Sequence, residues 1–154
     1  MQSLVGRVAA VDADGAELVD LRAAFDDLRR LRSWVDGREV ALARSIAALS
    51  SFPEKALAEA GRTSLRHAEV VFERAGTAEV VPTLAVSLEA GGVSGEHVDV
   101  LSRVLRRLEP AARGKLIEAA PGLVVVAEQS TADEFAPVVR AEAQRLERAG
   151  WVPE

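Results

Sequence analysis

The sequence LVDLRAAFDDLRRLRSWVDGREVALARSIAAL, from Leu18 to Leu49, is the longest periodic segment of the chain. Residues spaced seven apart return to the same face of an α-helix. We therefore predict one long helix whose apolar row packs into a helical bundle. The dipeptide Asp36-Gly37 could kink or split this helix, because an interior glycine costs about 1 kcal/mol relative to alanine. The apolar row consists of Leu21, Leu28, Val35, Leu42 and Leu49.

The same helix is also compatible with a coiled-coil dimer. Leu18, Phe25 and Ile46 lie in a companion row at three-to-four spacing, but Arg32 and Glu39 interrupt that row. Sustained coiled coils keep both rows apolar, so packing inside a bundle is favoured. A homodimer, or a partner protein bound through residues 18–49, remains the alternative.

Start and stop signals divide the rest of the chain into shorter helices. Prolines at 53, 82 and 110 and polar N-caps at 64, 94 and 131 begin helices. Glycines end three of them, with Gly61 closing the segment 53–60, Gly76 closing the segment 65–74 and Gly91-Gly92 closing the helix that begins at 82. Pro121-Gly122 interrupts the segment that begins at 110, and the apolar run 123–127 is interpreted as buried helix. We predict an all-α multi-helix bundle, with a single domain over 1–149 and a tail or linker at 150–154.

Composition excludes several classes of protein. The 154 residues are enough for one domain, and the absence of cysteine excludes disulfides and thiolate sites. No apolar stretch reaches the roughly 20 residues that a membrane span needs, so a cytoplasmic protein is expected. The net charge of −5 argues against general coating of nucleic acid. Residues 103–115 nevertheless carry five basic side chains against one glutamate.

The two histidines, His67 and His97, each follow a serine by three residues. Zinc needs about three or four ligands, and no His-Glu-x-x-His motif is present. Ser64, His67 and Glu69 do not face one another on a helix as a catalytic triad would. We therefore expect no metal, no cofactor and no enzyme activity. Each histidine is predicted to sit at the third position of its helix, near the serine cap or at a helix crossing.

A helix-turn-helix-like unit is predicted over residues 53–74, with the turn at 61–63. In such units the N-terminal end of the second helix meets DNA bases or phosphates. Glu69 and Glu73, further along, would repel the backbone unless they turn away. Packing of two short helices is the alternative interpretation. The candidate residues for binding double-stranded DNA, including three from the basic stretch, are Arg62, Thr63, Ser64, Arg66, His67, Arg103, Arg106 and Arg107.

The segment FPEKALAEAGRTSLRHAEVVFERAGTAEVVPTLAVSLEAGGVSGEHVDVLSRVLRRLEP, residues 52–110, resembles the actinobacterial thirteen-E-twelve repeat family. The likeness extends from about Leu21 to the EFAPVVRAEAQRLE stretch at 134–147. It implies a helical domain of unknown function that stands in front of an HNH endonuclease domain. The matching residues are Ser64, Ala68, Glu69, Glu73, Arg74, Ala75, Pro82, Leu88, Gly92, Ser94, His97 and Asp99.

The resemblance does not extend to nuclease residues. An HNH centre needs histidines and an asparagine, whereas this chain has no asparagine and only two early histidines. It ends where the family's linker towards the nuclease would start, so we expect either a fragment covering the front domain or a stand-alone relative. A fainter likeness links Pro82 and Gly92-Val93-Ser94 to ParB-type partition proteins. That likeness implies a DNA-recognition position for residues 64–74.

The sequence thus predicts a non-catalytic DNA-binding module, the accessory domain of an HNH-endonuclease-type protein. The alternative is a protein-interaction or oligomerisation domain that uses the long helix 18–49.

Overall fold

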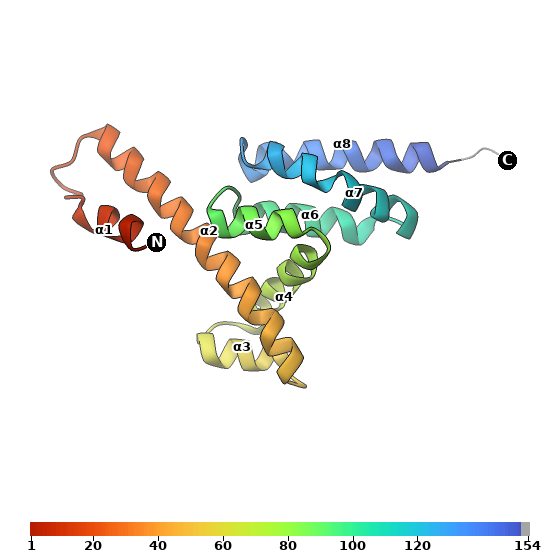
Figure 1. Cartoon of the computed structure of the whole chain (residues 1–154), viewed down its shortest axis with the longest axis horizontal. Helices are drawn as coiled ribbons and strands as arrows, with labels where there is room; N and C mark the ends of the chain where they lie inside the picture. Colours follow the sequence, from red (N-terminus) through yellow and green to blue (C-terminus); the bar gives the residue numbers. More distant parts are fainter. Residues whose placement is uncertain (152–154) are drawn as a thin grey trace.

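The computed structural model describes residues 1–151 of the chain. These residues form α-helices joined by short loops, with no strand among them, so the all-α prediction is confirmed (Figure 1). The helices are α1 (Gln2–Ala10), α2 (Leu18–Leu49), α3 (Pro53–Gly61), α4 (Leu65–Val80), α5 (Pro82–Ala90), α6 (Gly95–Arg107), α7 (Pro110–Ala127) and α8 (Ala132–Gly150).

The long helix α2 runs diagonally across the molecule, as Figure 1 shows. Its first turns carry α1, and the two form an arm that projects from the other helices. Arg7 joins them with a bidentate pair, Nε and Nη2 each donating to a carboxylate oxygen of Asp27 at 3.0 Å. This contact lowers the pKa of the Asp27 carboxyl. None of the helices predicted from the sequence corresponds to α1.

The buried face of α2 is not the predicted apolar row. It consists of Ser33, Gly37, Val40 and Ala43, whereas Val35, Leu42 and Leu49 are 46%, 56% and 89% exposed. Residues two apart on a helix point about 200° apart, so Val35 and Leu42 lie opposite Ser33 and Val40. Small side chains are on the inside because α4 and α5 pack closely against this part of α2. The prediction that the heptad row packs inward was therefore wrong for these three residues, while Leu21 and Leu28 are half-buried.

Gly37 marks the closest approach between α2 and α5. A Cβ atom added there would lie 2.8 Å from the Cγ of Glu89 and 3.2 Å from its Cα and backbone N. The helix runs through Asp36-Gly37 without interruption, so the expected break does not occur. The glycine serves close packing, and the tertiary contact outweighs its low helix propensity.

We expect Gly37→Ala to lower the free energy of unfolding by about 1 kcal/mol. The added methyl group must displace the α5 backbone, and such overpacking costs about 1–3 kcal/mol, partly offset by a gain in helix propensity of about 1 kcal/mol. The matched control is Gly114→Ala in α7, where a Cβ meets nothing within 4 Å. The control should be stabilised by roughly 0.5–1 kcal/mol. Urea denaturation measures both, and two changes of the same sign would contradict the close crossing.

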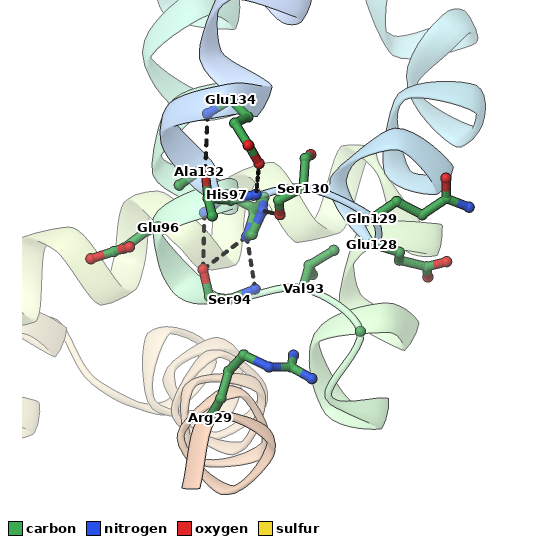
Figure 2. A pocket seen from close by; sticks show the side chains of 12 residues that line it. Arg29, Val93, Ser94, Glu96, His97, Glu128, Gln129, Ser130, Ala132 and Glu134 are labelled. Atoms are coloured by element: carbon green, nitrogen blue, oxygen red, sulfur yellow. Dashed lines mark hydrogen bonds between the residues drawn. The ribbon is translucent and has the colours of Figure 1, made fainter. Parts of the chain in front are cut away.

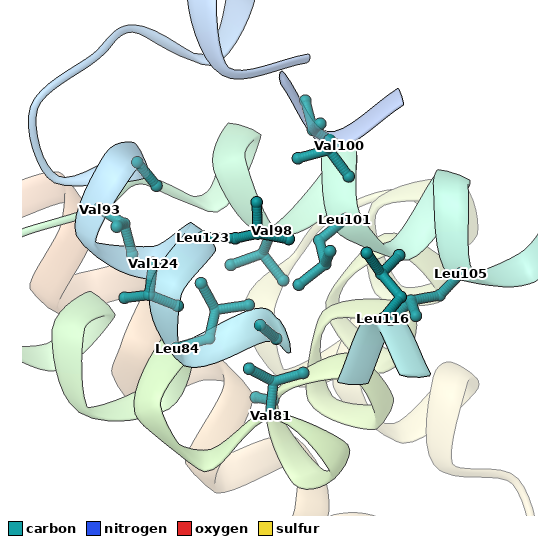
Figure 3. Close-up of a cluster of buried hydrophobic side chains, with 14 of the residues drawn as sticks. Val81, Leu84, Val93, Val98, Val100, Leu101, Leu105, Leu116, Leu123 and Val124 are labelled. Carbon is teal, nitrogen blue, oxygen red and sulfur yellow. The ribbon is translucent and has the colours of Figure 1, made fainter. Parts of the chain in front are cut away.

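The hydrophobic core lies between α4, α5, α6, α7 and α8. In Figure 3, Leu84 from α5, Val98 and Leu101 from α6 and Leu116 and Val124 from α7 point toward one another. All five are buried. This core holds in place the helices that carry the candidate site.

Two helices continue past residues that were predicted to end them, because packing stabilises the longer helix. Gly76 lies inside α4, which continues to Val80, just before Pro82. Pro121 lies inside α7, which continues to Ala127. Both residues face outward, while Thr77 and Ala120 beside them are buried. Burial of the neighbouring residues outweighs the local cost of a glycine or proline.

The predicted N-caps are confirmed. The hydroxyl oxygens of Ser64 and Ser94 accept the backbone N–H of His67 and His97, and Thr131 accepts that of Glu134. The carboxylate of Glu134 accepts the Thr131 N–H at 2.8 Å, which lowers the pKa of Glu134. The run 123–127 is helical and partly buried, as predicted. Gly150 is the last residue of α8, and residues 152–154 of the predicted tail lie outside the described part of the chain.

Candidate nucleic-acid interface

The corner between α3 and α4 is tight and open to solvent. α3 ends at Gly61, as predicted, and its C-cap Arg62 adopts the left-handed conformation with φ 50° and ψ 44°. The N–H groups of Arg62 and Thr63 donate to the carbonyl oxygens of Glu59 and Ala58, at 3.3 and 3.0 Å. A non-glycine residue in this conformation costs roughly 1 kcal/mol. The reversal directs the chain into the Ser64 cap of α4 after two residues.

The five candidate residues at this corner differ in exposure. Arg62, Ser64 and Arg66 are exposed, whereas Thr63 and His67 are half-buried. The Ser64 side chain caps the His67 N–H, and the first N–H groups of α4 have no partner inside the helix. The corner therefore presents two guanidinium groups at the positive end of a helix dipole.

His67 is directed toward α2 and not toward the open side of the corner. Its Nε2 lies 3.7 Å from Oε2 of Glu39. This contact ties the start of α4 to the long helix. A DNA contact by His67 would have to compete with Glu39, so His67 contributes little to the open surface.

The outer face of α4 is acidic beyond its first turn. Arg66, Glu69, Glu73 and Gly76 are all exposed at three-to-four spacing, which places them on one side of the helix. The two glutamates do not turn away from the side that Arg66 occupies. A helix that inserts along its length into a major groove would bring these carboxylates toward the phosphates, which is unfavourable. Only the tip of α4 suits a polyanion.

The basic residues of α6 do not join this tip. Arg106 donates to Glu73 of α4, and this exposed ion pair neutralises its charge. Arg103 and Arg107 line a hollow on the other side, between α6 and α8, together with Arg140. The predicted set of basic residues is thus divided among three places. Sequence reasoning missed Arg140, because nothing in the local pattern indicates which helix it faces.

A half-buried ion network fixes the three helices behind the corner. Nε and Nη2 of Arg74 donate to the two carboxylate oxygens of Asp99, both at 2.8 Å, and Nη1 lies 3.6 Å from Asp36. Asp36 also accepts the N–H of Gly95, the first residue of α6, at 3.0 Å. The hydrogen bonds to Asp99 raise the pKa of Arg74, while burial opposes that rise. The network joins α2, α4 and α6.

His97 occupies a second hollow, of about 460 Å³, where α6 begins beside the loop that leads to α8 (Figure 2). Its Nδ1 accepts the Ser94 N–H at 3.1 Å, and its Nε2–H donates to the Ser130 carbonyl at 2.8 Å. Its ring lies 5.6 Å from that of Phe135, between centroids. Both ring nitrogens are engaged, one at the Ser94 cap and one at the loop before α8, so the predicted structural role of His97 is confirmed.

Two other polar groups around this hollow are also engaged in the fold. Glu128 accepts the Ser87 hydroxyl at 2.6 Å, and Arg29 donates to the Gly91 carbonyl at 2.9 Å. Within residues 1–151, no cluster of three His, Asp or Glu residues has a geometry that would hold a metal ion. No helix in the same range is long and apolar enough to cross a membrane.

Comparisons of the chain with protein-family models, with curated proteins and with solved structures find no match. The resemblance to the thirteen-E-twelve family therefore stays a prediction.

Proposed function

We propose that this chain is a non-catalytic DNA-binding module that contacts duplex phosphates with the α3–α4 corner. The observation that carries the proposal is the exposure of Arg62 and Arg66 on either side of the Ser64 cap. Guanidinium groups bind phosphate through paired hydrogen bonds, and a helix N-terminus adds a favourable dipole. The resemblance described above supports a role as the accessory domain of an HNH-endonuclease-type protein.

The acidic surroundings define what kind of binding this corner allows. Glu69 is exposed next to the tip and repels phosphates, while Glu73 is engaged by Arg106, so the contact is with the DNA backbone at the helix tip. Such a contact carries little sequence information. It suits a module that brings a tethered catalytic domain to DNA, with a strong dependence on salt.

Arg62→Ala combined with Arg66→Ala is expected to weaken binding to a short duplex by at least about tenfold at low salt. Each lost phosphate contact should also lower the slope of log affinity against log salt by about 0.9, so the double variant should lose about 2. A mobility-shift titration at several salt concentrations measures both quantities.

The matched control is Arg22→Ala combined with Arg32→Ala, which removes the same charge from exposed positions on α2. For this control, the slope of log affinity against log salt should stay close to that of the unmodified chain. No binding of duplex DNA at low salt, or equal losses in the two double variants, would reject the proposal.

A second candidate function is self-association through α2. Its specific support is the exposure of Val35, Leu42 and Leu49 along one side of α2. Apolar side chains at seven-residue spacing can interdigitate with the same row of a second copy. Exposed apolar surface of this extent commonly marks an interaction site.

Light scattering over a range of protein concentrations tests this candidate. A dimer that dissociates when Leu42 and Leu49 are both replaced by serine is the expected result. Val86→Ser on α5, which replaces another well exposed apolar residue, is the control and should leave the dimer intact. A chain that stays monomeric at all concentrations would exclude self-association.

A further inference from the structure

The hollow between α6 and α8 is built from two helices that run in the same direction. His97, near the start of α6, bonds Ser130 just before α8, while Leu108 after α6 lines the hollow with Ala143 further along α8. The hollow measures about 440 Å³, within the range of small-molecule sites. Its floor includes apolar side chains, and exposed arginines stand at its rim. These are Arg103 and Arg107 from α6 and Arg140 from α8.

The three rim arginines concentrate positive charge on a protein of net charge −5. Among the ion pairs of residues 1–151, none involves any of them. Two other arginines on the same helices are neutralised, since Arg106 pairs with Glu73 and Arg145 with Glu142.

The dipole of α6 explains the position of only one of the three rim arginines. Arg107 lies in the last turn, where a cation is favoured, but Arg103 lies one turn earlier and Arg140 lies within α8. Three cations around one hollow repel one another, and a bound anion would relieve that repulsion.

We propose that this hollow, which we call the α6–α8 groove, binds a phosphate group. A guanidinium offers a planar fork of donors that matches phosphate oxygens, and three forks around one hollow suit an anion of two or more charges. Glu147 lines the same groove and opposes the anion from one position. The phosphate belongs either to a DNA backbone or to a free polyphosphate. The groove lies apart from the α3–α4 corner, and the two proposals can fail separately.

Titration calorimetry of the whole chain with inorganic pyrophosphate tests the site. Arg140→Gln should weaken pyrophosphate binding about tenfold, because one charged bidentate contact is lost. The matched control Arg148→Gln makes the same change on the same helix outside the groove and should have no effect. Glu147→Gln removes the opposing carboxylate and should tighten binding. These residues are exposed, so the variants should fold normally.

Three results would overturn the phosphate site. They are the absence of pyrophosphate binding by the unmodified chain, an equal loss in Arg148→Gln, and displacement of pyrophosphate by a glutamate-rich peptide at the same concentration of charge. The last result would assign the groove to an acidic protein segment.

Competition with a duplex that lacks terminal phosphates identifies the source of the phosphate. Displacement of pyrophosphate supports the site as a contact for the DNA backbone, whereas retention of pyrophosphate supports a site for a free phosphate-bearing ligand. The variant with Arg62→Ala and Arg66→Ala should bind pyrophosphate normally. A loss in that variant would contradict the independence of the groove.

Discussion

Replacing Arg74 by methionine is expected to lower the free energy of unfolding by about 3 kcal/mol. The Arg74 side chain is only 12% exposed, and it holds Asp99 through a bidentate contact and Asp36 through an ion pair. Methionine fills a similar stem volume but leaves both carboxylates without their cation. Removing one partner of a largely buried pair typically costs about 3–5 kcal/mol, and the partial exposure of both aspartates places the value at the lower end.

The best control is a second ion pair between the same two helices. Arg106 of α6 pairs with Glu73 of α4, and both side chains are more than half exposed. Arg106→Met should therefore change the free energy of unfolding by about 0.5 kcal/mol or less. Urea denaturation measures both variants, and similar losses at the two sites would show that burial of the Arg74 network has no special weight.

A double-mutant cycle separates the pair from the stem of the arginine. Arg74→Met together with Asp99→Leu should be less destabilised than the sum of the two single variants, by about 1–3 kcal/mol. Arg74→Lys keeps the charge but loses the fork, so it should show an intermediate loss. Additive effects across the cycle would contradict a direct interaction.

Replacing His97 by alanine is expected to cost about 3 kcal/mol. The substitution leaves the Ser94 N–H and the Ser130 carbonyl without their side-chain partner and opens a space beside Phe135. Each buried polar group that loses its partner costs about 1–3 kcal/mol, and the lost packing adds to this. Thermal or urea unfolding, followed by circular dichroism, gives the change.

His67 provides the matched comparison, because it occupies the same third position after a capping serine. Its side chain is 42% exposed, and its contact with Glu39 is 3.7 Å long. His67→Ala should therefore stay within about 0.5 kcal/mol of the unmodified protein. In His97→Gln the glutamine side chain can still accept the Ser94 N–H, as it does in a capping box. The stability loss of this variant should therefore lie between those of His97→Ala and His67→Ala. Equal effects at the two histidines would contradict the structural role of His97.

The helices follow from local sequence signals wherever these signals are strong. Ser64, Ser94 and Thr131 mark helix starts in the sequence, and each is an N-cap in the structure. These signals work because a cap depends on residues within one turn of each other. The stop signals at Gly76 and Pro121 were misleading, since their cost is small beside the burial of neighbouring side chains.

Which side of each helix is buried could not be predicted from local signals. The row from Leu21 to Leu49 has the stronger apolar periodicity, yet α2 buries Gly37 and Ala43. A close helix crossing favours small side chains, and no local rule shows where that crossing occurs. Prediction of the candidate site from the sequence is limited for the same reason. Arg62 and Arg66 could be predicted from the turn they flank, but Arg140 meets Arg103 and Arg107 only through the packing of α8 on α6.

The amino-acid sequence by itself determined that this chain is helical, where most of its helices begin, and that its histidines follow serine caps. These properties depend on interactions between residues close together in the sequence, so the local sequence is enough to predict them. Only the tertiary structure decided that His97 is buried while His67 is half-exposed, and that the arginines divide among three places. Which side chains are buried, and which charged groups lie next to each other, depends on contacts between segments far apart in the chain. These contacts form only when whole helices pack together.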